Sequence, residues 1–224
     1  MPTIYRLVPE GRNIDIDVKR FNASLPTTIR VDAQRDGIFA TVASDADGEA
    51  ATQALIDREL DRLFFLTCVR LRAKMCQTTE SVDLNVKYRV HGEIEEGTIP
   101  LEWTERLSLQ LKLWALAADS LDLTLKIILY FQIIELSFPD IHDETAYPTY
   151  RDDTHTPHPR TEAKLLRHLV AHAGQARPET EKYLNFLGLP PRLGNLTHAA
   201  WILKLSERIG CVEQQAQMVL RSAF

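Results

Sequence analysis

Cysteine is scarce in this sequence, and Cys68, Cys76 and Cys211 form neither a CxxC pair nor a metal-finger spacing. An odd number of cysteines without a framework predicts reduced thiols in a cytoplasmic protein. The first residues lack the basic and then apolar pattern of a secretory signal. The most apolar stretch, 121–138, is interrupted by charged and amide side chains, so no membrane span is predicted.

The chain also lacks an excess of basic residues, because 26 Lys and Arg stand against 31 Asp and Glu, a formal net charge of −5. A protein coated in nucleic acid is usually basic, so any contact with RNA here must be local. The short signatures of P-loop NTPases, dinucleotide-binding proteins, zincins, serine hydrolases and EF-hands are missing as well. These absences weaken the corresponding enzyme classes, and we predict neither a cofactor nor a metal site.

Residues 1–100 are predicted to form an α+β module with an antiparallel sheet. Apolar and polar residues alternate most clearly in 82–90, and shorter strands are expected at 3–8, 13–18, 27–31 and 38–42. A long amphipathic helix is expected over about 48–75. No motif indicates the role of this module, and contact with a protein partner is the interpretation we give it.

Residues 101–224 show no strand pattern and are predicted to form an all-α bundle of four or five helices. The expected helices cover 103–118, 120–136, 160–173, 178–187 and 196–222, and a loop rich in Pro, Thr, Asp and His covers 140–159. Because 121–136 is apolar almost all round, it should lie at the centre of the bundle. The same apolar surface could face a second copy, so a homodimer is predicted.

The segment 160–174 carries a packing face and a cationic face on one helix. At 100° per residue, Leu165, Leu166 and Leu169 share the apolar side. The opposite side carries Arg160, Lys164, Arg167 and His168, with His172 at its margin. A cationic stripe of this kind can hold phosphate, although a solvated helix face is the simpler interpretation.

Two groups of histidines have spacings that metal sites use. His168 and His172 are four residues apart, but no acidic residue stands beside them, so a polar helix edge is the favoured interpretation. The loop supplies a second group, for which ordinary solvated side chains are again favoured. This group comprises His142, Asp143, Asp152, His155 and His158.

An Arg-x4-His motif at 167–172, with polar His168 directly after the arginine, resembles the motif of the all-α HEPN superfamily. The stretch 128–135 is similar to the tyrosine-rich helix of bacterial HEPN proteins. Within that group, 166–174 most resembles MauJ-like proteins, which are encoded with methylamine-utilisation genes. The resemblance covers about 101–224 and leaves the N-terminal module outside it.

The resemblance implies a metal-independent RNA endonuclease in which two copies pair so that both motifs line one cleft. In such a site His172 exchanges a proton with the 2′-hydroxyl or the leaving 5′-oxygen, and Arg167 holds the scissile phosphate. His168 orients either the phosphate or Arg167. Arg160 and Lys164 are candidates for binding the substrate, and cleavage leaves a 2′,3′-cyclic phosphate. Stress response, toxin activity and antiviral defence are the roles expected of such an enzyme.

Two further features of the sequence bear on this hypothesis. Glu135, at the end of the central helix, is a candidate acidic partner of Arg167 and otherwise a surface carboxylate. In a regular helix, Arg167 and His172 project about 140° apart. A shared phosphate therefore needs the long arginine stem, a distortion of the helix before Gly174, or a partner subunit.

A non-catalytic accessory or interaction protein, as MauJ-like proteins are expected to be, is the alternative function. Many HEPN domains keep the helical bundle without detectable chemistry. In that case the bundle would serve as an assembly surface, and the motif residues would have no chemical role.

Overall fold

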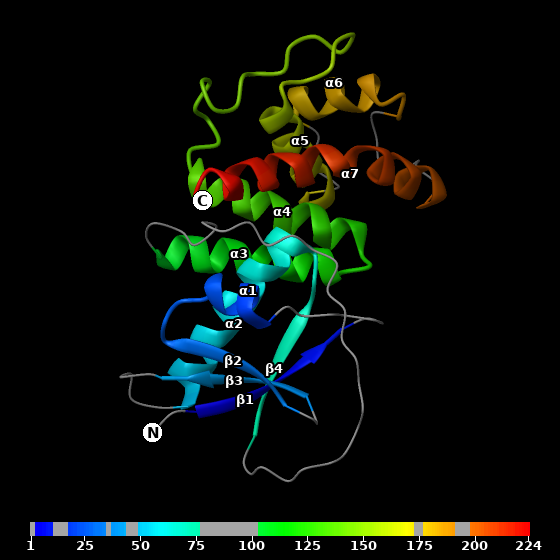
Figure 1. Ribbon diagram of the computed structural model, residues 1–224. Coiled ribbons are helices and arrows are strands. Elements are labelled where there is room, and N and C mark those ends of the chain that lie inside the picture. The colour runs from blue at the N-terminus through cyan, green and yellow to red at the C-terminus, as the bar shows by residue number, and fades with distance from the viewer. Residues whose placement is uncertain are drawn as a thin grey trace. The chain divides into compact units, whose positions relative to one another are not determined.

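The computed structural model describes residues 3–10, 18–34, 37–43, 49–76, 103–172, 177–190 and 198–224 (Figure 1). The chain divides into two compact units, Met1–Trp103 together with Phe224 and Thr104–Ala223. The first unit contains an antiparallel sheet and the second is helical, which confirms the predicted α+β class. The predicted strand 82–90 and residues 13–17 of the predicted strand 13–18 lie outside the described residues.

The first unit contains a four-stranded sheet with the order β2-β3-β1-β4, and neighbouring strands run antiparallel. Three of its strands match the predicted positions to within a few residues. The strands are β1 (Thr3–Pro9), β2 (Ile29–Gln34), β3 (Gly37–Val42) and β4 (Leu71–Met75).

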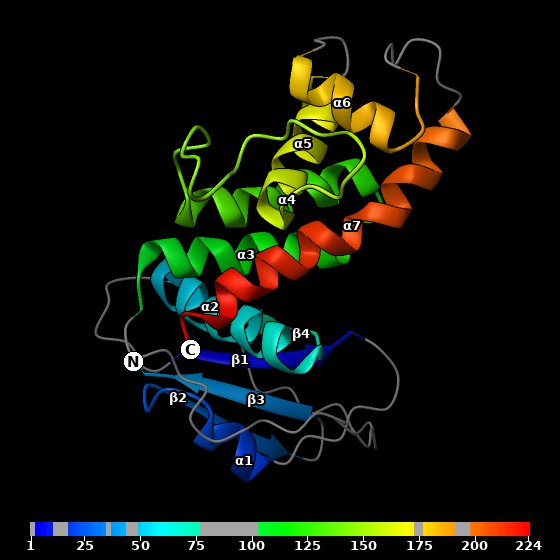
Figure 2. The ribbon, with the colours of Figure 1, turned by 90° about the horizontal axis from the view of Figure 1, so that it is seen from above.

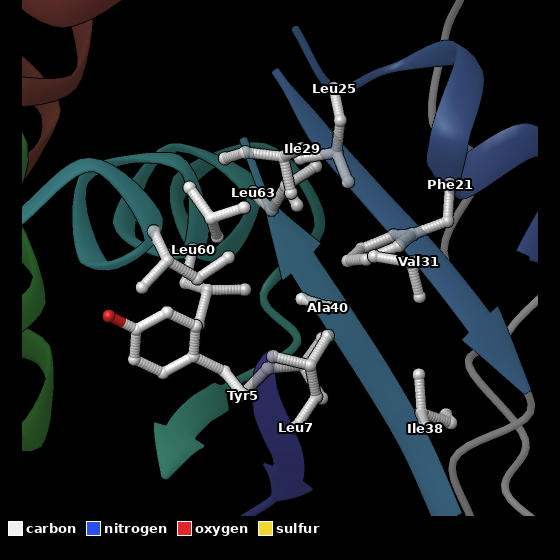
Figure 3. Packing of buried hydrophobic residues seen from close by; sticks show 13 residues of the cluster. Tyr5, Leu7, Phe21, Leu25, Ile29, Val31, Ile38, Ala40, Leu60 and Leu63 are labelled. Atoms are coloured by element: carbon white, nitrogen blue, oxygen red, sulfur yellow. The ribbon is translucent and has the colours of Figure 1, made fainter. Parts of the chain in front are cut away.

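One face of this sheet forms the core of the first unit. The register places Tyr5 of β1 opposite Ala40 of β3 and Met75 of β4, so that alternate side chains of all the strands share a face. Two helices, α1 (Val18–Ala23) and α2 (Glu49–Thr67), add apolar side chains to the same cluster (Figure 3). This packing accounts for the alternation of buried side chains within the described strands.

The predicted helix over 48–75 is wrong at its C-terminal end, where residues Leu71–Met75 form β4. The helix stops at Thr67 because Cys68 takes a left-handed conformation with φ of 57°. The chain then reverses and pairs with β1, and this long-range pairing outweighs local helix propensity. The helix α1 was also not predicted, and its first residue, Val18, was assigned to a strand.

The second unit consists of helices at the predicted positions, and each begins and ends within a few residues of its expected bounds. Thr104 caps the first of them by accepting a hydrogen bond from the N–H of Leu107, and Asp122 caps the next. The helices are α3 (Glu105–Asp119), α4 (Leu123–Ser137), α5 (Pro159–Ala171), α6 (Pro178–Phe186) and α7 (His198–Arg221).

Helix α4 is the central element of the second unit, as its apolar composition predicts. It packs against α3, α5 and α7 (Figures 1 and 2). The buried amide of Gln110 on α3 donates to the carbonyl of Ile133 at 2.8 Å and to the hydroxyl of Ser137 at 2.9 Å. These bonds fix α3 against α4.

Among the described residues, no helix combines the length with the apolarity that crossing a bilayer requires.

The loop between α4 and α5 is tied to the helices around it. The hydroxyl of Tyr147 donates to the carbonyl of Phe138 at 3.0 Å, and the hydroxyl of Thr161 donates to the carbonyl of Pro148 at 2.8 Å. Both bonds join the loop to the helices on either side of it. The loop therefore forms a defined wall beside α5.

Candidate functional site

Helix α5 carries the predicted motif, and its ends explain how the motif is presented. Pro159 occupies the first turn, where its fixed φ suits a helix start and its missing N–H costs nothing. Leu165, Leu166 and Leu169 are buried, and α5 packs against α4 and α7. The other face of the helix remains available for polar side chains.

Arg167 and His172 converge, although five residues separate them. Arg167 Nη1 lies 3.4 Å from His172 Nε2. The helix ends at Ala171, and His172 is its C-cap with φ of −133° and ψ of 43°. Because His172 has left the helical conformation, its ring does not follow the 140° projection of a regular helix. The long arginine stem and the end of the helix together bring the two groups within reach.

His168 lies beside this pair but is buried, with 9% of its surface exposed. Its ring centroid is 4.9 Å from that of His172. Burial lowers the pKa of His168 below its usual value, and the charges of Arg177, His172 and Arg167 lower it further, while Glu179 opposes them. His168 is therefore held in its neutral form near pH 7, in contrast to the solvated position expected from the helix face.

A pocket of about 80 Å³ opens next to the motif, and residues of α4, α5, α6 and the loop line it. Its cationic side chains are those of Lys164, Arg167 and Arg177, and its acidic ones are those of Glu135 and Glu179. His168, His142 and Thr180 add further polar groups. The pocket therefore offers donors and positive charge in a confined space, which suits a small anion.

Glu179 on α6 organises one side of this pocket. Its Oε1 accepts a hydrogen bond from the N–H of Tyr150 at 3.1 Å, and its Oε2 lies 3.7 Å from Lys164 Nζ. The carboxylate thus ties the loop to α6 and offsets the charge of Lys164. Lys164 is consequently held at the pocket wall as one member of an ion pair.

The structure separates the remaining candidates into two groups. Glu135 and Arg167 both line the pocket, but no ion pair joins them among the residues that the structure describes. Arg160 is not a lining residue, and its guanidinium lies over the ring of Phe138, 4.4 Å from the centroid. Lys164 therefore keeps its place in the candidate site, whereas Arg160 has a packing partner away from it.

The histidines considered for metal binding are arranged differently from a metal centre. His155 Nδ1 contacts Asp152 Oδ2 at 2.6 Å, and Asp143 accepts hydrogen bonds from the backbone N–H and the hydroxyl of Thr145. Within the described ranges, no three His, Cys, Asp or Glu side chains come together in a way that could hold a metal ion.

Arg177, Glu179 and Thr180 were not among the predicted site residues. Arg177 and Pro178 stand at the start of α6, and the N-terminus of a helix is a common anion site. This signal was present in the sequence. The proximity of α6 to α5, on which the pocket depends, could not be inferred from spacing.

Comparisons with known proteins add no assignment to this geometry. No family model matches the chain, and searches of curated proteins and of solved structures each give no significant match.

Proposed function

We propose that this protein is a metal-independent RNA endonuclease of the HEPN kind. The observation that carries the proposal is the 3.4 Å approach of Arg167 Nη1 to His172 Nε2, at the end of a helix and beside an open pocket. A guanidinium and an imidazole at this distance can act on the same phosphate. This is the convergence that the motif requires.

The chemistry assigned to this pair is an internal transfer in RNA. The 2′-oxygen attacks phosphorus, the bond from phosphorus to the 5′-oxygen breaks, and a 2′,3′-cyclic phosphate forms. In a pair of copies, one His172 takes the proton of the 2′-hydroxyl and the other gives a proton to the 5′-oxygen. Arg167 binds the phosphate oxygens and stabilises the negative charge that builds on them.

His168 acts as a positioning residue in this scheme. It is buried under the motif, its ring lies 4.9 Å from that of His172, and its carbonyl accepts the N–H of His172 at 2.9 Å. These contacts hold His172 in place at the end of α5. In its neutral state His168 adds no positive charge of its own beside Arg167 and His172.

The test is cleavage of single-stranded RNA in the presence of EDTA by the purified full chain. We expect cleavage with cyclic phosphate ends, and a loss of at least about 100-fold in rate in both Arg167→Ala and His172→Ala. Arg106→Ala, which removes an exposed arginine of α3, is the matched control and should keep full activity. Absence of cleavage by the wild type, or equal cleavage by folded motif variants, would reject the proposal.

Exposed leucines around the α3–α4 turn support a second candidate function, a non-catalytic interaction protein. Leu121 is 99% exposed, and Leu116 and Leu125 are 46% and 45% exposed. Apolar side chains gathered on a surface are typical of protein contacts. If Leu121→Ser and Leu125→Ser abolish capture of a partner that the motif variants still bind, this second function is favoured.

A further inference from the structure

Helix α6 begins at the pocket without a side-chain cap. Arg177 is its N-cap residue and makes no capping hydrogen bond, and Pro178 has no N–H. The first helical bond runs from the N–H of Glu181 to the carbonyl of Arg177, at 2.9 Å. The N–H groups of Glu179 and Thr180 therefore find no acceptor among the described residues. Such groups, at the positive end of a helix dipole, favour an anion.

His168 provides a second and independent indication of a ligand. It lines the same pocket with more than nine-tenths of its surface buried, and its Nε2 has no hydrogen-bond partner in the part of the chain that the structure describes. A buried imidazole nitrogen without a partner is costly, and it is normally satisfied by a bound group or by water. A residue of the pocket wall on α5 therefore carries an unpartnered ring nitrogen, and the start of α6 carries unpaired N–H groups.

The charges around the pocket decide which ligand fits. Arg167 and Arg177 add two positive charges, while Lys164 is largely offset by Glu179. Glu135 is the other acidic residue of the wall and lowers the net positive charge. The volume of about 80 Å³ is several times the space that one water needs and suits a single phosphate group, but not a nucleotide.

We propose that this pocket binds one phosphate group, held by the N–H groups of Glu179 and Thr180, by His168 Nε2 and by the guanidinium of Arg177. Because Arg167 contacts His172 and also lines the pocket, the site lies directly beside the cleavage motif. The identification of this group as a phosphate of the RNA chain next to the cut rests on the proposed function. Binding of phosphate itself does not depend on cleavage.

The first experiment measures binding of inorganic phosphate to the full chain by calorimetry and by the NMR signals of the histidine rings. We expect saturable binding that moves the His168 signal, and at least a 5-fold weaker affinity in Arg177→Gln and in His168→Gln. Arg106→Gln removes the same charge from an exposed position of α3 and should bind as the wild type does. Unchanged affinity in both pocket variants, or no binding by the wild type, would overturn the proposal.

A second arm distinguishes RNA phosphate from free phosphate. An RNA oligonucleotide with 2′-O-methyl groups cannot be cleaved, and we expect it to compete with inorganic phosphate in the wild type but not in Arg177→Gln. Phosphate binding that depends on Arg177 without such competition supports a site for free phosphate. This outcome contradicts the RNA function but not the phosphate site. We expect His172→Ala to lose cleavage and to keep phosphate binding. That result would show that cleavage depends on His172 and that the phosphate site does not.

The pH dependence of binding gives a third readout. The charges of Arg167, His172, Arg177 and Glu179 act on His168. The pocket wall adds Lys164 on α5, Glu135 on α4 and His142 on the loop. A bound anion favours protonated His168, so the affinity of the wild type relative to that of His168→Gln should rise as the pH falls from 8 to 6. His168→Gln retains only the titration of phosphate and of the other groups, and a pH profile identical to that of the wild type would contradict the assigned role of His168.

Discussion

Glu162, a buried carboxylate in the first turn of α5, joins three helices behind the candidate site. It is 2% exposed and accepts a hydrogen bond from the hydroxyl of Tyr183 on α6 at 2.8 Å. Arg208 on α7 donates to it through Nε at 2.6 Å and also through Nη2. Burial raises the pKa of Tyr183, and the neighbouring carboxylate of Glu162 raises it further, so this hydroxyl remains a donor. The orientation of α6, which carries Arg177, depends on this network.

Replacement of Glu162 by Gln should lower the free energy of unfolding by about 1.5–3 kcal/mol, because charge-assisted bonds are lost while Arg208 stays partly buried. Urea unfolding followed by helical circular dichroism measures the change. The control is Glu207→Gln, which breaks an exposed pair with Lys204 at 2.8 Å and should cost about 0.5 kcal/mol or less. Equal losses in the two variants would show that the network does not stabilise the helical unit.

Single residues of the candidate site differ in how far the sequence predicts them. The Arg167–His172 motif and Lys164 can be found from spacing on one helix, because residues of a helix face are set by its periodicity. The burial of His168 cannot be predicted from spacing, since it depends on how α6 and the loop pack beside α5. Arg177 is missed for the same reason, although its position before Pro178 marks a helix start.

Elements are predicted well where a single face is buried. The strands β1 and β3 and the helices of the second unit follow directly from period-2 and period-3.6 patterns. The main error concerns the C-terminal end of the predicted helix 48–75. Residues 71–75 resemble the preceding helix in composition, so local patterns do not separate them from it. The left-handed Cys68 and the free edge of β1 decide its structure, and neither is visible in local composition.

At the scale of the helix, α4 offers a direct test of its central position. Ile134→Ala should lower the free energy of unfolding by about 2–5 kcal/mol, because this side chain is fully buried and leaves a cavity. Leu125→Ala on the same helix removes a similar volume from an exposed position and should change stability by about 0.5 kcal/mol or less. Thermal and urea unfolding of both variants compare the two faces, and a similar loss in each would contradict the assignment of α4 as the core helix.

The whole molecule combines two units with separate cores. The sheet unit buries its apolar cluster between one sheet face and the helices α1 and α2. The helical unit contains the motif, the pocket and the network of Glu162, so every residue of the candidate site belongs to one unit. The proposed chemistry is therefore a property of Thr104–Ala223, and the sheet unit supplies no residue to it.

The proposed mechanism uses two copies of the chain, and this requirement can be measured. Light scattering on the purified protein should give about twice the chain mass of 25.5 kDa at micromolar concentration.

Mixing two variants tests whether each cut uses His172 from both copies. In that case, an equal mixture of wild type and His172→Ala, exchanged to equilibrium, should retain about one quarter of the activity of the same total amount of wild type. Independent chains would retain about half, the statistical result for a monomeric site. A mixture with Arg106→Ala should keep full activity, which controls for the exchange itself. A mass near 25.5 kDa together with half activity would exclude the two-copy site and leave catalysis to a single motif.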